Sequence, residues 1–404
     1  MKRLIEFSIF IIILPLSISA QVINIPDPNF KTALINQGVD LNNDGEIQVS
    51  EAIIVDTLEL ENSNISQMDG LESFSNIQYL NCSSNNLYNL DVTKLVKLSW
   101  LNCRRNYNIK NLDLANLIDL TYLDCLGNKI SILNVKSLTK LTNLNCQGNL
   151  ITLLELENLT QLSYLDCSAN NIKSLNLTNL SNLLYLNCYY NQITELKITK
   201  LKSLKYLQCD ENKISKLVTT GLLNLEYIFC QNNLIDSLDI SKLPNLIRLY
   251  CSGNRIASLN AVDLPNLAYL VCEWNKMSKL NLSNLSNLDI LDCDNNELSN
   301  LVLVGLEKLT LLRCCCNKLT TLDVSELLSL NVLYCNDNII SSIFLKNGSL
   351  ESELGWWANP IQYVCCDEDQ VNIIKKNLQV NGMENVVVNT YCTFVPGGKF
   401  YNIK

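Results

Sequence analysis

LSYLDCSANNIKSLNLTNLSN (residues 162–182) decides the fold, because the unit that follows it, residues 183–203, repeats its pattern as LLYLNCYYNQITELKITKLKS. One cysteine in each unit marks the period, and an Asn follows three residues after each of these cysteines. Successive cysteines keep a 21-residue period, with one extra residue between Cys103 and Cys125. The spacing is kept by Cys82, Cys103, Cys125, Cys146, Cys167, Cys188, Cys209, Cys230, Cys251, Cys272, Cys293, Cys314 and Cys335. A fixed period of this size indicates a solenoid.

The apolar positions of one unit read L-x-x-L-x-C-x-x-N-x-I-x-x-L-x-L-x-x-L. The L-x-C part alternates, which predicts a short strand with Leu and Cys facing inward. Successive units then form a parallel sheet with about 4.8 Å between rungs. The Asn side chain both donates and accepts, so we expect it to satisfy the backbone groups of the turn. The return path predicts turns with short extended or 3₁₀ pieces, and neighbouring units must cover each other's leucines.

This pattern resembles the leucine-rich repeat family, whose core is L-x-x-L-x-L-x-x-N/C-x-L, with Cys in place of the third strand leucine. The short unit is most similar to bacterial surface repeat proteins of the internalin type. The resemblance implies an α/β-type solenoid, a right-handed superhelix with a parallel concave sheet of about 14 rungs and few helices outside the caps. It also implies that partners bind the concave strand face. We assign the repeats to residues 58–346.

Composition narrows the function. The 404 residues form one elongated domain with caps, carry a net charge of −9 and contain no histidine. Catalytic triads, general bases and zinc sites that depend on histidine are therefore excluded. The acidic balance argues against nucleic acid and anionic membranes as partners. The column cysteines are expected to be free, buried thiols, because in-register neighbours fit disulfide geometry poorly and a dry leucine core disfavours metal-bound thiolates.

Residues 1–20 have the features of a secretory signal peptide. Lys2 and Arg3 precede an apolar run, and Ser19-Ala20 offers a cleavage site before Gln21. We therefore expect an exported protein that is secreted, periplasmic or held at the cell surface. No later segment of the mature chain reads as a transmembrane helix.

Residues 21–57 are predicted to form an N-terminal cap, with a short helix over residues 28–38. The stretch DLNNDGEIQVSE (residues 40–51) then matches an EF-hand-like calcium loop. One structural calcium ion would take side-chain oxygens, one carbonyl and a bidentate carboxylate from Asp40, Asn42, Asp44, Glu46 and Glu51. The alternative interpretation is an Asp/Asn-rich turn that caps a helix without metal.

The outward strand positions are the candidate partner face. Eight of the thirteen residues that lie three before a column cysteine are aromatic. Rigid exposed aromatics are typical binding anchors. The densest group, our predicted partner-binding set, comprises Tyr185, Tyr189, Tyr190, Tyr206, Tyr227, Phe229, Tyr250, Tyr269 and Trp274. The alternative is a tyrosine ladder that only packs rung on rung and stabilises the sheet.

Residues 347–404 are predicted to form a C-terminal cap in which GWWANP is a loop and IQYVCCDEDQ restates the repeat with Cys366 in phase. A helix over residues 369–380 and a strand at VVVNTYC follow. In an oxidising compartment, Cys392 is expected to pair with Cys365 or Cys366. The state of Cys315 and Cys316, beside the column residue Cys314, stays open.

The sequence predicts a non-enzymatic recognition protein that binds a protein or glycan on its concave face. The alternative is a structural or assembly spacer of the cell envelope with no dedicated ligand. An enzyme is disfavoured because no nucleophile–base pair, catalytic carboxylate pair or phosphate loop is evident.

Overall fold

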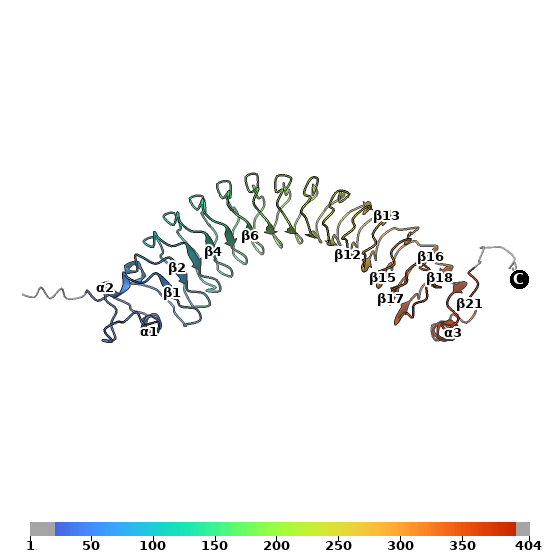
Figure 1. Ribbon diagram of the computed structural model, residues 1–404, viewed down its shortest axis with the longest axis horizontal. Helices are drawn as coiled ribbons and strands as arrows, with labels where there is room; N and C mark the ends of the chain where they lie inside the picture. The colour runs from blue at the N-terminus through green and yellow to red at the C-terminus, as the bar shows by residue number, and fades with distance from the viewer. Residues whose placement is uncertain (1–20, 393–404) are drawn as a thin grey trace, which may run out of the picture.

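A computed structural model describes residues 21–392 as an arch of stacked turns, with short strands lining its inner side (Figure 1). The predicted signal peptide, residues 1–20, lies outside the described residues. Among residues 21–392, no helix combines the length and apolar character of a membrane span. The solenoid predicted from the 21-residue period is confirmed.

Fifteen parallel three-residue strands form the concave sheet, close to the predicted 14 rungs. Each strand pairs with the equivalent residues of the next unit, as in Tyr164↔Tyr185 and Leu165↔Leu186. The strands are β1 (Thr57–Glu59), β2 (Tyr79–Asn81), β3 (Trp100–Asn102), β4 (Tyr122–Asp124), β5 (Asn143–Asn145), β6 (Tyr164–Asp166), β7 (Tyr185–Asn187), β8 (Tyr206–Gln208), β9 (Tyr227–Phe229), β10 (Arg248–Tyr250), β12 (Tyr269–Val271), β14 (Ile290–Asp292), β15 (Leu311–Arg313), β17 (Val332–Tyr334) and β19 (Glu353–Gly355).

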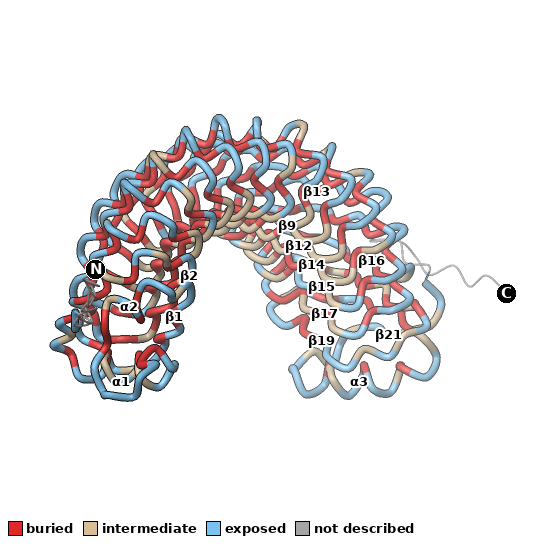
Figure 2. Tube along the Cα trace, turned by 60° about the vertical axis from the view of Figure 1, so that its left-hand side comes forward, coloured by how far each residue is buried: buried red, intermediate tan, exposed pale blue. Residues whose placement is uncertain are grey.

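The core is a continuous inward column of leucines and cysteines. In a typical rung, Leu186 and Cys188 are fully buried, and so are the return-path residues Ile193 and Leu201. The buried residues recur along the inside of every turn, and exposed residues follow the outer edges (Figure 2). Each turn is covered only by its two neighbours. The first and last turns therefore need caps that cover their apolar sides.

The short extended pieces predicted for the return path pair into two further short sheets, and this pairing was not predicted. One pairs β11 (Ser258–Asn260) with β13 (Lys279–Asn281). The other joins β16 (Thr321–Asp323), β18 (Ser342–Phe344), β20 (Tyr363–Cys365) and β21 (Val387–Asn389). Elsewhere in the described residues the return path consists mainly of turns, with one isolated parallel bridge between Leu196 and Leu217 and one 3₁₀ segment, η1 (Leu71–Ser73).

The repeat continues further than predicted at the C-terminal end. β19 adds a fifteenth strand to the concave sheet and ends at Gly355, the first residue of GWWANP, whereas the rest of that stretch is irregular, as predicted. Trp356 follows Cys335 by one repeat period, fills the cysteine position and is buried. Cys366 is not in phase with the cysteine column, because it directly follows β20, which pairs with β18 in the return-path sheet.

Helices cover both ends of the arch (Figure 1). At the N-terminal end, α1 (Pro28–Asn36) is capped by the Asp27 carboxylate and buries Phe30 and Leu34, and α2 (Val49–Ala52) contains Glu51, the last residue of the acidic loop. At the C-terminal end, α3 (Val371–Val380) buries Ile374 and Leu378. A disulfide joins Cys365 to Cys392, with the Cα atoms 5.3 Å apart, and Cys366 is a buried free thiol.

Candidate binding face

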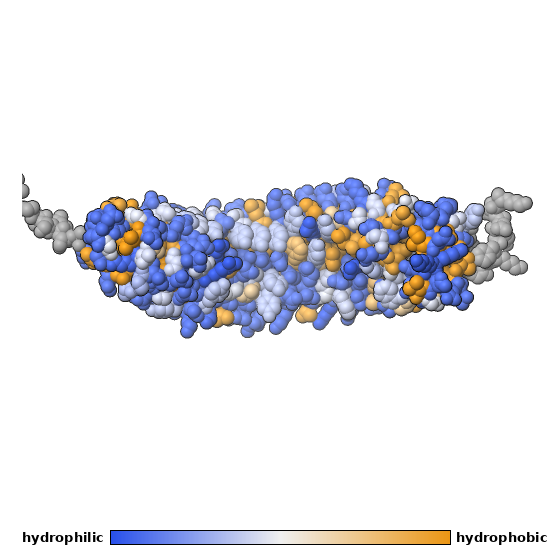
Figure 3. Space-filling model, turned by 90° about the horizontal axis from the view of Figure 1, so that it is seen from below, coloured by the Kyte–Doolittle hydropathy of each residue, from blue (hydrophilic) through white to orange (hydrophobic). Residues whose placement is uncertain are grey.

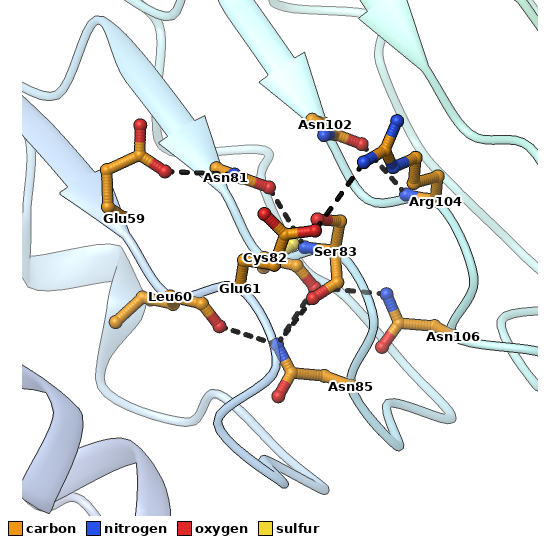
Figure 4. A network of polar contacts seen from close by, with 10 residues as sticks. All are labelled: Glu59, Leu60, Glu61, Asn81, Cys82, Ser83, Asn85, Asn102, Arg104 and Asn106. Atoms are coloured by element: carbon orange, nitrogen blue, oxygen red, sulfur yellow. Dashed lines mark hydrogen bonds and ion pairs between the residues drawn. The ribbon is translucent and has the colours of Figure 1, made fainter.

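Each concave strand is held at its end by the repeated asparagine (Figure 4 shows the first rungs). Asn191 Nδ2 donates to the carbonyls of Cys167 and Cys188 at 3.0 and 3.2 Å, and its Oδ1 accepts from Ile172 N at 2.9 Å. One side chain therefore links two rungs and a return path. Asn359 makes the same contacts at the last rung. This asparagine ladder fixes the backbone from which the face projects.

The 22-residue unit interrupts the asparagine ladder once. Its extra residue produces a second left-handed position, Tyr107 with φ 62°, beyond Arg105. In the next rung, Asn128 Nδ2 still donates to the carbonyls of Cys103 and Cys125. Its Oδ1 is buried without a hydrogen-bond partner among the described residues. The insertion therefore costs the ladder one acceptor contact.

The residue two after each column cysteine has a left-handed backbone. Tyr190 has φ 52° and Trp274 has φ 53°, and equivalent residues of the other rungs share this conformation. The turn directs these side chains out of the packed column, and they are 60% and 63% exposed. These two predicted partner residues are the most accessible aromatic side chains beside the concave sheet's middle rungs. Tyr189 is half-buried and contacts the Tyr190 ring at 5.8 Å.

We call the thirteen residues three before each cysteine the first column. They are Tyr79, Trp100, Tyr122, Asn143, Tyr164, Tyr185, Tyr206, Tyr227, Arg248, Tyr269, Ile290, Leu311 and Val332, and all are half-buried. Tyr185 stacks on both Tyr164 and Tyr206 with ring centroids 4.5 Å apart. The rings thus bury their faces against each other and present edges to solvent. The ladder interpretation accounts for these contacts, while the edges stay available to a partner.

The second column comprises the residues one before each cysteine. In the N-terminal half it is polar and buried, as in Asn81 and Asp166. It turns aromatic at Phe229 and Tyr250, whose rings stack 5.1 Å apart, and Phe229 also contacts Tyr206 at 5.4 Å. Figure 3 shows the molecule from below, with hydrophobic side chains at both ends of the arch and more of them on its C-terminal side.

The structure brings most of the predicted partner set together across β7–β12. Six of its nine members lie in the two columns and three lie in the adjoining turns, and Arg248 completes the first column between Tyr227 and Tyr269. Its guanidinium carbon lies 4.4 Å from the centre of the Tyr269 ring. Trp274 lies in the turn after β12. The predicted partner set did not include Arg248.

Carboxylates accumulate beyond this patch, towards the C-terminal end of the face. Burial and the neighbouring Asp292 raise the pKa of Asp294 to about 6. Burial also raises the pKa of Glu273, with Asp292 adding to the effect. Arg313 lies 5.3 Å from the centre of the Tyr334 ring and partly offsets the negative charge. This acidic part of the face was missed, because its members are divided between the position one before and the position one after the column cysteine.

The cysteine column has no features of a reactive site. Burial raises the pKa of the Cys82 and Cys251 thiols to about 12. Neutral thiols at pH 7 are poor nucleophiles and poor metal ligands. Cys315 is half-buried, with its pKa raised to about 12 by burial and Asp294, and Cys316 is the one exposed free thiol of residues 21–392.

The acidic loop of the N-terminal cap is folded around its own backbone. Asp40 accepts hydrogen bonds from Asp44 N and Gly45 N, and both oxygens of Glu51 accept backbone amides, from Leu41 and Gln48. Glu46 pairs with Lys31 at 2.7 Å.

The side-chain oxygens of the loop are of the type that binds a hard cation, but they do not point towards one common centre. The amides of Asn42 and Gln48 donate to the Asp44 carboxylate at 3.0 Å, where a cation would compete with them. Within residues 21–392, no three metal-ligating side chains of the His, Cys, Asp or Glu type are grouped closely enough to hold an ion.

The solenoid is similar to several solved structures, whereas no protein-family model and no curated protein matches the chain. The functional domain of InlJ from Listeria monocytogenes, described as including a cysteine ladder, is 27% identical with a TM-score of 0.63, over 82% of this chain and 83% of that one. A leucine-rich repeat protein of Leptospira interrogans is 25% identical with a TM-score of 0.61, over 80% of each chain.

A third structure shares the fold alone. It is the ectodomain of the Arabidopsis thaliana receptor kinase GASSHO1/SCHENGEN3 in complex with Casparian strip integrity factor 2. That ectodomain is 20% identical with a TM-score of 0.53, over 79% of this chain and 50% of that one.

Proposed function

Taking the chain as a leucine-rich repeat solenoid of internalin-like fold, we propose that it is an exported, non-enzymatic recognition protein whose concave face binds a macromolecular partner. The observation that carries the proposal is the accessible aromatic patch across β7–β12, with Tyr190 and Trp274 projecting beside stacked rings. Aromatic anchors on a rigid scaffold bind with little loss of side-chain entropy.

A protein ligand is favoured over a glycan. The first-column rings bury their faces against one another, so the broad aromatic planes that sugars stack on are largely covered. Ring edges, hydroxyls and nearby carboxylates suit peptide groups and basic side chains. The plant ectodomain of the same fold is described in complex with Casparian strip integrity factor 2.

Site-specific photo-crosslinking tests this proposal. Benzoylphenylalanine is placed at position 190 or 274, and at the exposed Ile132 of a return path as the matched control. Living cells or envelope extracts are exposed to the full chain, and crosslinked species are identified by mass spectrometry. We expect a discrete adduct at positions 190 and 274 that excess unlabelled protein removes and that protease digests. Equal labelling at position 132 would leave the spacer interpretation as the better one.

We further propose that the acidic loop binds one calcium ion as a structural staple of the N-terminal cap. Its support is a preformed loop in which Gly45 makes the turn at φ 79° and Ile47 is fully buried beneath. Binding requires the Asn42 and Gln48 amides to release Asp44. Calorimetric titration of calcium into chelated protein should give heat and a higher melting temperature. Both effects should vanish in the double variant Asp44→Ala, Glu51→Ala but persist when the exposed Asp113 is changed to Ala.

A further inference from the structure

The aromatic stack of the first column has one interruption in its N-terminal half, at Asn143. Before it, Trp100 and Tyr122 stack with centroids 4.7 Å apart, and after it Tyr164 and Tyr185 stack at 4.5 Å. The strand register places Asn143 between Tyr122 and Tyr164. These two rings are two rungs apart, or about 9.6 Å, which is room for one further planar group at normal stacking distance.

The interruption is a hollow in the concave surface. Its lining is Tyr122, Leu123, Asn143, Asn145 and Tyr164. Trp100 covers one face of the Tyr122 ring, and Tyr185 covers one face of the Tyr164 ring. The other face of each ring therefore borders the hollow, whereas Tyr185, within the stack, has a neighbouring ring on both faces.

Two buried carboxylates lie beside the hollow. Asp124 and Asp166 flank Asn145 in the second column and are 3% and 6% exposed. Asp166 is well satisfied, since it accepts from Ser168 and Asn187. Among the described residues, Asp124 accepts one hydrogen bond only, from Leu126 N, and burial raises its pKa although Arg104 partly opposes this. The hollow thus combines aromatic walls with negative charge that is incompletely compensated.

Another rung of this chain shows which chemical group fits between two tyrosine rings of the first column. Arg248 occupies the same column between Tyr227 and Tyr269, and its guanidinium lies against the Tyr269 ring at 4.4 Å. The second column there is Phe229, Tyr250 and Val271, which contains no carboxylate. A guanidinium at the Asn143 rung would have the same aromatic neighbours and, in addition, Asp124 and Asp166.

We propose that the hollow at Asn143 receives an arginine side chain of a protein partner, held between Tyr122 and Tyr164 above Asp124 and Asp166. This rests on the proposed recognition function and names one anchor for it. Guanidinium is planar, permanently charged and stacks on aromatic faces. A lysine ammonium is charged but not planar, and a sugar or tyrosine ring carries no charge. None of these groups therefore matches both the aromatic walls and the negative charge of the hollow.

The test compares four small probes. Three are acetylated, amidated tripeptides, Gly-Arg-Gly, Gly-Lys-Gly and Gly-Tyr-Gly, and the fourth is methyl glucoside. Each probe is titrated into the full chain, and its binding is measured by saturation-transfer difference NMR. We expect the arginine peptide to receive the strongest saturation. Asn143→Tyr, which continues the stack, should weaken its binding roughly tenfold or more. Asn143→Ala keeps the hollow and should retain binding. Asp124→Asn should weaken binding and reduce its salt dependence.

Asn143→Arg is the second filling variant, to be used if circular dichroism shows that Asn143→Tyr does not fold. Equal binding by wild type and a folded filling variant would overturn the proposal. So would stronger saturation of the tyrosine peptide or the glucoside than of the arginine peptide. Either result could coexist with specific crosslinking at positions 190 and 274, in which case the recognition function would stand without this anchor.

Discussion

Removing one member of the asparagine ladder should destabilise the middle of the arch strongly. Asn191→Ala leaves Ile172 N buried without its acceptor. The carbonyls of Cys167 and Cys188 lose one donor each but keep another, from Asn170 and Asn212. An orphaned buried amide costs about 1–3 kcal/mol and each of the two lost hydrogen bonds about 0.5–1 kcal/mol, so we expect a loss of about 2–5 kcal/mol.

Asn191→Asp separates the acceptor role from the donor role. Its carboxylate can still accept from Ile172 N, but its second oxygen would face the carbonyls of Cys167, Cys188 and Tyr189. At pH 7 the loss should therefore exceed that of Asn191→Ala. It should shrink as the pH falls and the carboxyl takes up a proton that can be donated.

Urea unfolding followed by circular dichroism measures both variants, and hydrogen exchange locates the weakened rungs. Asn182→Ala is the matched control, because this asparagine of the same unit is exposed and donates only to Thr160 O. It should cost less than about 0.5 kcal/mol. An Asn191→Ala loss no larger than that of the control would refute the account of the ladder as the support of the strands.

Three further outcomes follow from the thiols, the carboxylates and the disulfide. A thiol reagent should modify the native protein quickly only at Cys316, and it should reach all 16 free cysteines after unfolding. Cys316→Ser should abolish the fast phase of modification. Rapid modification of the column thiols would contradict their burial. Burial and Asp292 raise the pKa of Asp294 to about 6, so the folded form holds a proton there that the unfolded form releases near its ordinary value of 3.8. Its destabilising effect is fully present above pH 6 and declines as the pH falls from about 6 towards 3.8. Asp294→Asn should therefore be more stable than wild type by about 1–2 kcal/mol at pH 8 and equally stable near pH 4, a difference that pH-dependent melting would detect. Cys392→Ala opens a loop of 27 residues, which should cost about 3.5 kcal/mol and increase proteolysis between Cys365 and the C-terminus while leaving the central rungs protected.

The repeat could be predicted because every inward position is constrained by two neighbours. Leu186 and Cys188 must face the core wherever the 21-residue register is kept, and the sequence shows that register directly. The fifteenth rung was missed because Trp356 replaces the cysteine, so following the period itself would have found it where following the cysteines did not. The return-path pairing of β18 with β20 has no such period, since it depends on how tightly the turns of the last units wind.

The candidate face was predictable in its members but not in its details. That Tyr185 and Tyr206 share a face follows from the strand alternation. Whether their rings stack or splay depends on rotamers, which the sequence does not fix. The hollow at Asn143 shows this limit, because the asparagine is visible in the column but its consequence appears only when the neighbouring rings are known to be parallel.

The left-handed residue after each concave strand meets two opposing requirements, low backbone strain and an exposed side chain. Glycine adopts this conformation without strain and occupies it in Gly127, Gly148 and Gly253. Other side chains cost about 1 kcal/mol or more there, so Tyr190 and Trp274 weaken the scaffold that presents them. Replacing such a residue with glycine should therefore stabilise the arch and remove any contact that the lost side chain makes with a partner. A glycine scan of these turns, scored for melting and for capture in parallel, would separate the rungs that serve folding from those that serve contact.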